Sequence, residues 1–194
     1  MMWFFAENAQ ARSELYARLA NNKNLADSFR KAEKVLRKTI SGGGKILIFG
    51  NGGSAAQAQH FAAELVCMFE KRRRALPAIA LTTDSSILTA QSNDFGFGSV
   101  FSRQIEALAN RDDVVIGLTT SDFKDDGHSL NIKNAFEMAI IKGATSIGLF
   151  SSKTKHLLGL VNVAVVVPSK NTALIQEVHL AIIHVLCGQI EKDL

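Results

Sequence analysis

The chain has 194 residues, the length of one domain, and about 70% of its unfolded surface would be buried on folding. Its net charge of +4 suits an anionic substrate, and because no aromatic-rich stacking motif accompanies the basic residues, we expect no nucleic-acid partner. The distant Cys67 and Cys187 form no CxxC, no leader resembles a signal peptide, and the apolar stretches are too short and too interrupted to span a bilayer. These features predict a soluble, cytoplasmic protein with reduced thiols and no membrane partner.

Two helices are predicted at the start of the chain, at 5–20 and 25–40, because apolar residues recur there at helical spacing. Three adjacent aromatic side chains stand near the N-terminus: Trp3, Phe4 and Phe5. Exposing all three would be unfavourable in a monomer. We therefore predict that residues 1–42 form a helical hairpin used for oligomerisation, ahead of a domain formed by residues 43–194.

From Lys45 onward, short β-prone apolar runs alternate with helical patterns, which indicates a parallel sheet covered by helices on both faces. The predicted strands span 46–49, 78–81, 114–118, 146–150 and 161–167. The predicted helices span 54–69, 85–91, 100–108, 130–141 and 172–190. The predicted fold class is α/β, a three-layer αβα sandwich with a five-stranded parallel sheet. Ligands of such sheets bind at the carboxyl ends of the strands.

The first of these strands ends in Gly-Asn-Gly-Gly-Ser, residues 50–54. Glycines allow a tight turn and a close approach of the backbone to a ligand, and Ser54 is expected to cap the helix that follows. The N-terminus of that helix would attract an anionic group or a polar sugar. The alternative is a turn that joins a strand to a helix without binding anything.

His60 and Glu64 are four residues apart on the helix that this turn begins, and therefore share one face. An imidazole and a carboxylate so placed can share a metal ion or a proton, although a surface His–Glu pair on an amphipathic helix has the same spacing. The dense basic run at 71–74 is interpreted as a solvated helix end, where cations complement the helix dipole.

Polar residues also follow later elements. Asp94 stands in a predicted turn, where it either faces a ligand or caps the next helix. Thr119, Thr120 and Ser121 follow the third strand and offer three hydroxyls that could hold a phosphate without Lys or Arg, or they form an ordinary polar turn. The acidic stretch 123–128 is expected to lie on the surface.

The last predicted helix carries Gln176 and His184. His184 stands among apolar residues, so it is either a functional group or a core histidine with one satisfied nitrogen. Eight residues separate it from Gln176, which corresponds to about 12 Å along a straight helix. One copy of this helix is therefore not expected to bring both side chains to one metal ion, and we expect a site that draws on more than one subunit.

Four blocks of the sequence resemble the sugar isomerase (SIS) domain family and, within it, the bacterial phosphoheptose isomerases. The blocks are GNGGSAAQAQHFAAEL at 50–65, LPAIALTTDSSILTA at 76–90, NDFGF at 93–97 and IQEVHLAIIHVLCGQIE at 175–191. The resemblance implies a flavodoxin-like SIS fold and a homotetramer whose N-terminal helices join a central bundle, with active sites at subunit interfaces. It also implies isomerisation of sedoheptulose 7-phosphate to D-glycero-D-manno-heptose 7-phosphate for lipopolysaccharide core or related glycans.

The resemblance further implies roles for individual residues. Glu64 and His184 become the catalytic acid/base pair, which fits a reaction that carries a proton between adjacent carbons. The zinc site found in some members would comprise His60, Glu64, Gln176 and His184, whose nitrogen and oxygen donors suit that ion. The residues expected to contact the phosphosugar substrate are Asn51, Gly52, Gly53, Ser54, Asp94, Thr119, Thr120, Ser121 and Gln176.

The chain also departs from the family. The family's phosphate loop usually reads Ser-Thr-Ser-Gly-Asn-Ser, whereas here Ser121 is followed by a longer acidic loop that ends before Ser129. Asp122 and Asp125 would repel a phosphate that lay near them. Met68 and Leu174 stand where many relatives have arginine. These differences affect the expected phosphate contacts and not the fold.

Two alternative functions share the SIS domain. One is a non-catalytic SIS protein that binds a replication initiator or another protein partner. Those relatives lack counterparts of Glu64 and His184, and because this chain has both, we favour catalysis. The other is an isomerase of a different phosphosugar, because the altered loop could fit another chain length.

Overall fold

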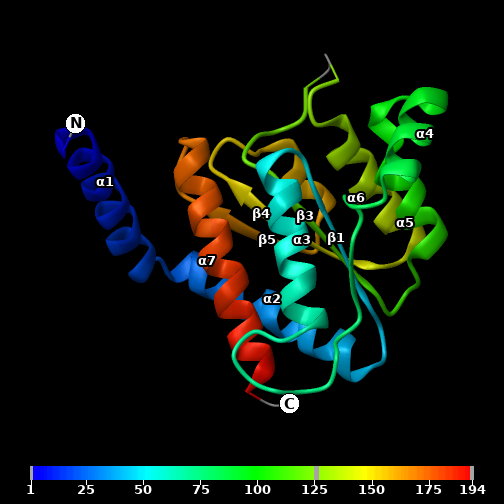
Figure 1. Ribbon diagram of the computed structural model, residues 1–194, viewed down its shortest axis with the longest axis horizontal. Helices are drawn as coiled ribbons and strands as arrows, with labels where there is room; N and C mark the ends of the chain where they lie inside the picture. The colour runs from blue at the N-terminus through cyan, green and yellow to red at the C-terminus, as the bar shows by residue number, and fades with distance from the viewer. Residues whose placement is uncertain (1, 125–126, 193–194) are drawn as a thin grey trace.

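The computed structural model describes residues 2–124 and 127–192, and its middle layer is a five-stranded parallel sheet (Figure 1). The strands are β1 (Ile46–Gly50), β2 (Ala78–Ala80), β3 (Val114–Leu118), β4 (Thr145–Ser151) and β5 (Val163–Val167). They lie in the order β2-β1-β3-β4-β5, and each neighbouring pair is parallel. The predicted α/β three-layer sandwich is therefore confirmed.

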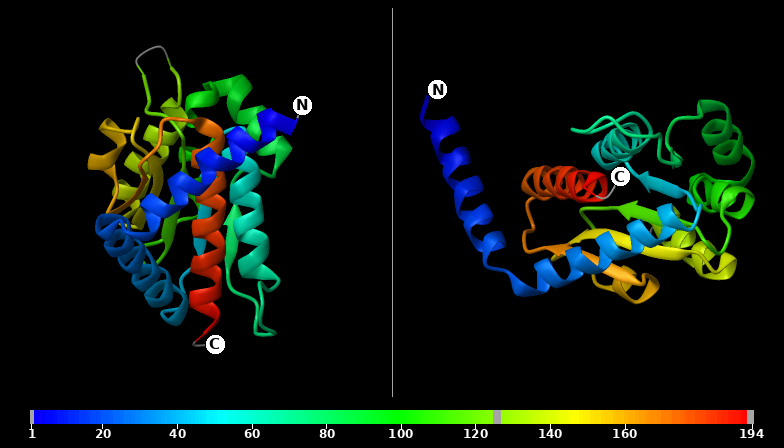
Figure 2. Two further views of the ribbon diagram at one scale, coloured as in Figure 1. Left: turned by 90° about the vertical axis from the view of Figure 1, so that its left-hand side faces the viewer. Right: turned by 90° about the horizontal axis from the view of Figure 1, so that it is seen from below.

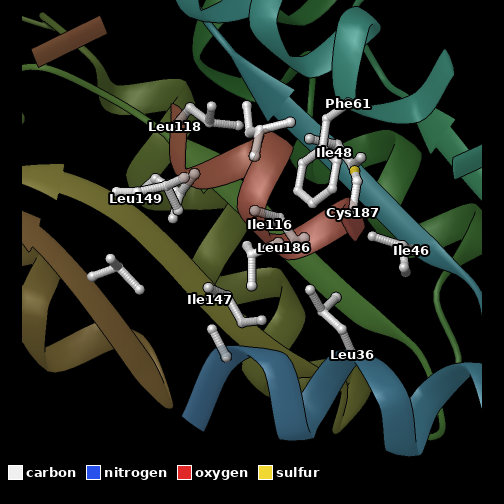
Figure 3. Close-up of a cluster of buried hydrophobic side chains, with 14 of the residues drawn as sticks. Leu36, Ile46, Ile48, Phe61, Ile116, Leu118, Ile147, Leu149, Leu186 and Cys187 are labelled. Carbon is white, nitrogen blue, oxygen red and sulfur yellow. The ribbon is translucent and has the colours of Figure 1, made fainter. Parts of the chain in front are cut away.

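Helices cover both faces of this sheet. They are α1 (Met2–Ala20), α2 (Lys23–Ser41), α3 (Gly53–Val66), α4 (Ser85–Phe95), α5 (Ser102–Leu108), α6 (Leu130–Lys142) and α7 (Thr172–Glu191). Short 3-10 turns follow at Phe97–Ser99 and His156–Leu160. One core lies between the sheet and α2, α3 and α7, where Leu36, Phe61 and Leu186 meet the strands (Figure 3). The second core lies between the opposite face and α5 and α6.

Glycines in the central strands make room for aromatic rings in the second core. Gly117 of β3 pairs with Phe49 of β1 on one side and with Gly148 of β4 on the other. A Cβ atom at Gly117 would collide with the rings of Phe49 and Phe136, and one at Gly148 would collide with the ring of Phe150. The strands therefore lack side chains where these rings pack.

The N-terminal helices form an open pair, with α1 extending away from the body of the domain (Figure 2). The side chain of Asn22 accepts a hydrogen bond from the backbone N–H of Leu25 and so caps α2. Trp3, Phe4 and Phe5 of α1 are 82%, 74% and 78% exposed. An apolar groove of about 430 Å³ also opens between α1, α2 and α7.

The last helix corrects one expectation. By length and composition, α7 is apolar enough to cross a membrane, because its 20 residues form one uninterrupted and largely apolar helix. Its buried residues, Ile175, Ile183 and Leu186 among them, pack in the first core. The apolar character of α7 therefore reflects its position against the sheet.

The basic run at 71–74 is not a helix end, because α3 already ends at Val66 and the chain folds back beneath the end of α7 (Figure 1). Lys71, Arg72 and Arg74 are exposed in this loop, as expected of a solvated run, but Arg73 is not. There the Nε atom of Arg73 lies 3.1 Å from Oε1 of Glu191, and each side chain is only 2% exposed. Glu191 also accepts hydrogen bonds from the backbone N–H groups of Phe69, Glu70 and Lys71. Burial raises the pKa of Glu191, but these donors and Arg73 outweigh it and hold that pKa below its usual value.

Candidate functional site

A cleft of about 680 Å³ opens at the carboxyl edge of the sheet. It lies between the turn after β1, the loop after β3, the start of α6 and the first turns of α7. Seven of the predicted substrate residues line it: Asn51, Gly52, Ser54, Thr119, Thr120, Ser121 and Gln176. The position of the cleft agrees with the rule that α/β sheets bind ligands at this edge.

The glycine turn places α3 against the cleft, but Ser54 does not cap it. Gly52 has φ +54° and is itself the N-cap residue, so the helix begins at Gly53 and Ser54 lies buried in its first turn. Gly53 does not line the cleft, although a Cβ atom there would come within 2.6 Å of Nε2 of Gln176. Glycine at this position therefore lets the Gln176 side chain lie over the turn.

Asn51 is held by a partner that sequence reasoning did not identify. Its amide and that of Asn131, at the start of α6, exchange two hydrogen bonds of 2.9 and 2.8 Å. Asn131 is buried and also lines the cleft. The pair fixes the turn after β1 against α6. No local pattern predicts it, because the two residues are 80 positions apart.

The hydroxyl loop after β3 curls into the cleft. The hydroxyl of Thr119 donates to the carbonyl of Ser121, 3.0 Å away, and accepts a bond from the Ser121 N–H. The hydroxyl of Ser121 lies 3.0 Å from Nε2 of His128. His128 and Ser129 also line the cleft, so the longer loop still delivers a serine to it.

Asp122 does not line the cleft, which corrects the expectation that it would repel a phosphate there. Its carboxylate accepts hydrogen bonds of 2.8 Å from the N–H groups of Lys155 and His156, and lies 2.9 Å from Nδ1 of His156. Burial raises the pKa of Asp122, but these bonds outweigh it and lower that pKa overall. Asp125 and Asp126 lie outside the described residues.

Asp94 occupies the last turn of α4 and does not line the cleft of this chain. Helix α4 continues to Phe95 and ends at Gly96, whose φ is +86°, so the predicted turn is largely helical. The exposed carboxylate of Asp94 accepts a bond from the side chain of Asn93, and it caps no helix. Both expectations for Asp94 therefore remain unmet within one chain.

A second cluster joins α3 to α7. Nε2 of His60 lies 2.9 Å from Nε2 of His184 and 3.4 Å from Oε1 of Glu64. The ring of Phe69 stacks on His184 with centroids 5.4 Å apart, a contact that sequence reasoning missed. One protein chain therefore brings together His60, Glu64 and His184, the three residues predicted for catalysis or metal binding on these two helices.

The core histidine is His179 and not His184. His179 is fully buried, and its Nε2 lies 3.0 Å from the carbonyl oxygen of Phe150. Burial lowers the pKa of His179 to about 4, so this side chain is neutral at pH 7. His184 is only half-buried, which leaves its ring available for chemistry.

The cleft and the cluster of His60, Glu64 and His184, the His–Glu cluster, lie at different positions along the axes of α3 and α7. Helices α3 and α7 pack side by side (Figure 1). Residues at the N-terminal end of each helix, Ser54 and Gln176, line the cleft. Gln57 of α3 donates to the carbonyl of Gln176, and His60 meets His184 further along. The eight residues from Gln176 to His184 correspond to about 12 Å. Within one chain, Gln176 therefore lies apart from the other predicted metal ligands.

The predicted zinc ligands are only partly assembled in one chain. His60, Glu64 and His184 supply two imidazole nitrogens and a carboxylate oxygen, which is the donor chemistry that zinc prefers. Within residues 2–124 and 127–192, however, no group of three or more His, Cys, Asp or Glu side chains is arranged to hold a metal ion. A zinc site at this position would need further ligands or a rearrangement of these side chains.

Comparisons with known proteins agree on one family. The family model described as "SIS domain" matches residues 10–151. The phosphoheptose isomerase of Geobacter sulfurreducens is 45% identical over 186 residues, which cover 96% of both chains. That of Pelobacter propionicus is 48% identical over 170 residues, covering 88% of this chain and 85% of the relative.

Solved structures give the same result. A phosphoheptose isomerase from Francisella tularensis has a TM-score of 0.91 and 35% identity, and the match covers 98% of both chains. The phosphoheptose isomerase GmhA from Neisseria gonorrhoeae has a TM-score of 0.83 and 38% identity, covering 98% of this chain and 96% of that one. The similarity thus includes the N-terminal helices as well as the sheet.

Proposed function

The chain belongs to the SIS-domain family, and from this premise we propose that it isomerises sedoheptulose 7-phosphate to D-glycero-D-manno-heptose 7-phosphate. Its relatives are named phosphoheptose isomerases, a type of aldose–ketose isomerase whose product serves heptose biosynthesis. We propose that the reaction takes place in the cytoplasm and that the heptose is used for lipopolysaccharide core or a related glycan. The comparisons give no support to a non-catalytic, partner-binding role.

The observation that carries the mechanism is the contact of His60 with both His184 and Glu64. In the proposed reaction, the Glu64 carboxylate removes a proton from C1 of the ketose while the His184 imidazolium protonates O2, which gives an enediol. His184 then removes the O1 proton, and Glu64 delivers its proton to C2. The aldose results, and both side chains regain their starting protonation states.

Surrounding residues would orient this pair. His60 contacts both members and can fix the imidazole tautomer of His184, and Phe69 stacks on the same ring. The hydroxyls of Thr119, Thr120 and Ser121 would hold the phosphate, together with the start of α6, whose N-terminus favours an anion. Asn51, Ser54 and Gln176 would bind the hydroxyls of the sugar. Gly52 allows the turn to approach the substrate.

We also propose zinc as a cofactor, bound by His60, Glu64 and His184 and completed by Gln176 from another copy. When bound, the ion would act as a Lewis acid toward the sugar oxygens, in place of the proton that the His184 imidazolium gives to O2, because an imidazole that holds zinc is unprotonated. Metal analysis of the purified protein, with and without prior exposure to a chelator, tests this assignment. Less than about one zinc per four chains after expression in zinc-supplemented medium would count against it.

The assembly that we propose is a homotetramer whose active sites lie at subunit interfaces. The exposed aromatic side chains of α1 and the apolar groove beside α7 offer surfaces that a second copy would cover. A second reason for this assembly is that the cleft and the His–Glu cluster of one chain are separated along α3 and α7. In an oligomer, the cleft of a second copy could lie next to that cluster. Asp94 would likewise reach a substrate only from such an arrangement.

The direct test is incubation of the purified protein with sedoheptulose 7-phosphate, followed by NMR detection of the anomeric proton of the aldose. Fructose 6-phosphate and ribulose 5-phosphate serve as shorter ketose controls. We expect conversion of the heptulose phosphate in preference to both. Conversion of only a shorter sugar phosphate would mean that the protein is an isomerase of a different phosphosugar. Conversion of none of the three sugar phosphates would contradict the proposed function.

A further inference from the structure

The cleft carries almost no charge of its own. Among the described residues that line it, His128 is the only ionisable side chain. The other polar groups are hydroxyls and amides, those of Thr119, Ser121, Asn51 and Gln176 among them. A phosphate ester carries a charge of about −1.5 to −2 at neutral pH. Hydroxyl donors and helix N-termini can orient such a group, but they neutralise only part of that charge.

The loop before α6 positions His128 at the cleft. The carbonyl of His128 accepts a hydrogen bond from the N–H of Lys124, and Nε2 of His128 lies 3.0 Å from the hydroxyl of Ser121. Ser129, the next residue, has φ +56° and turns the chain into α6. The imidazole is thus attached both to the hydroxyl loop and to the helix start, the two elements expected to hold the phosphate.

We infer that His128, in its protonated form, binds the substrate phosphate together with the hydroxyls of Thr119, Thr120 and Ser121. The inference rests on the proposed function, because it requires a phosphosugar in this cleft. A protonated imidazole adds a positive charge and two N–H donors, and charge-assisted bonds of this type are stronger than neutral ones. His128 would then supply the cation that the positions of Met68 and Leu174 lack.

Three charged side chains near this loop, those of Asp122, Lys133 and Lys153, are engaged elsewhere. Asp122 bonds to the segment that contains His156, and Lys133 pairs with Glu137 while its Nζ lies 5.7 Å from the centre of the Phe123 ring. Lys153 donates a hydrogen bond to the hydroxyl of Thr172, the first residue of α7. Lys124 is exposed in the same loop as His128, and Asp125 and Asp126 lie outside the described residues.

This arrangement makes phosphate binding depend on pH. Histidine changes charge between about pH 5 and 8, and a phosphate monoester loses its second proton near pH 6. For the ordinary values of these two groups, the favourable pair of imidazolium and dianion is therefore most populated at about pH 6 to 6.5. As the pH rises further, the imidazole loses its charge, and the affinity for phosphate should fall.

The test compares the wild type with His128→Asn, His128→Lys and a matched control, His156→Asn, which removes an exposed histidine outside the cleft. The KM for sedoheptulose 7-phosphate is measured between about pH 6 and 9, and binding of inorganic phosphate is followed by calorimetry. We expect His128→Asn to weaken both about tenfold near pH 6.5, to leave kcat within about twofold, and to remove the loss of affinity at high pH. His128→Lys should restore affinity at both ends of the range, and His156→Asn should resemble the wild type.

Unchanged KM and phosphate affinity in His128→Asn would overturn the inference, as would an equal loss in His156→Asn. The calorimetric arm separates this inference from the proposed function, because phosphate binding needs no turnover. A protein that binds phosphate through His128 but does not isomerise the heptulose phosphate would contradict the function and support the inference. A protein that isomerises the heptulose phosphate with the same KM in the wild type and in His128→Asn would support the function and contradict the inference.

Discussion

At the scale of single residues, the two histidines of α7 have separate roles. His179 and His184 are five positions apart, so they point in directions about 140° apart around the helix. His179 faces the core and bonds to the carbonyl of Phe150, whereas His184 faces His60 and the ring of Phe69. Apolar neighbours surround both residues in the sequence. Only the packing of α7 in the first core decides which of them is buried.

The burial of His179 makes the fold sensitive to acid. The pKa of its imidazole falls from the ordinary 6.5 to about 4 on folding, so between these values the unfolded chain binds a proton that the folded protein excludes. The free energy of unfolding should therefore decrease as the pH drops through this range, by roughly 3 kcal/mol in total. His179→Gln, which can keep the bond to Phe150, should lose most of this dependence. Urea unfolding at pH 7 and at about pH 4.5, at one protein concentration, measures it; equal acid sensitivity in both proteins would contradict the assignment.

At the scale of elements, the pairing of α3 with α7 organises the site. Contacts join the two helices and the loop after α3 at three heights: Gln57 with Gln176, His60 with His184, and the backbone after α3 with Glu191. The loop also anchors the catalytic segment, because Nη2 of Arg73 donates to the carbonyl of Glu64 at 2.6 Å. Arg73 thus connects the end of α7 to the residue proposed as the base.

Replacing Arg73 by methionine should leave Glu191 buried without its counter-ion and lower the free energy of unfolding by about 3–5 kcal/mol. Arg72→Met is the matched control, because Arg72 lies next to it in the same loop and is exposed. Chemical denaturation of both variants checks the prediction. A loss in Arg73→Met no larger than in Arg72→Met would show that the buried pair does not stabilise this loop.

The sequence predicts the elements better than their ends and their partners. The strands are recognisable because runs such as 46–49 and 114–118 are β-prone and buried on both faces. The glycine turn and the hydroxyl loop are recognisable because their chemistry is local. In contrast, the pairing of Asn51 with Asn131 and the burial of Arg73 depend on segments far apart in the chain. The extension of α4 through Asn93 and Asp94 also runs against their low helix propensity.

At the scale of the whole molecule, the proposed interface should join the cleft of one chain to the His–Glu cluster of another. Because one chain brings His60, Glu64 and His184 together, we expect the catalytic pair itself to come from a single subunit. The phosphate would then be bound by a neighbouring copy. This arrangement narrows the sequence-based expectation that one site draws on more than one subunit.

Mixed oligomers test this division. Glu64→Gln protein, with an intact cleft, is refolded with Asn51→Ala protein, which has an intact cluster and an altered cleft. At some mixed interfaces, the intact cleft of a Glu64→Gln chain then faces the intact cluster of an Asn51→Ala chain, so part of the activity should return. A mixture of Glu64→Gln with His184→Asn should stay inactive, because each cluster then carries one defect. Recovery only in the second mixture would place Glu64 and His184 of one site on different chains.

The proposed chemistry depends most directly on Glu64 and His184, and the decisive measurement is the turnover of sedoheptulose 7-phosphate by Glu64→Gln and His184→Asn beside the wild type. We expect kcat to fall by at least about a hundredfold in each variant, because each loses a proton-transfer group, while the melting temperature and the oligomeric state stay those of the wild type. Near-normal turnover in either correctly folded variant would contradict the assignment of the acid/base pair.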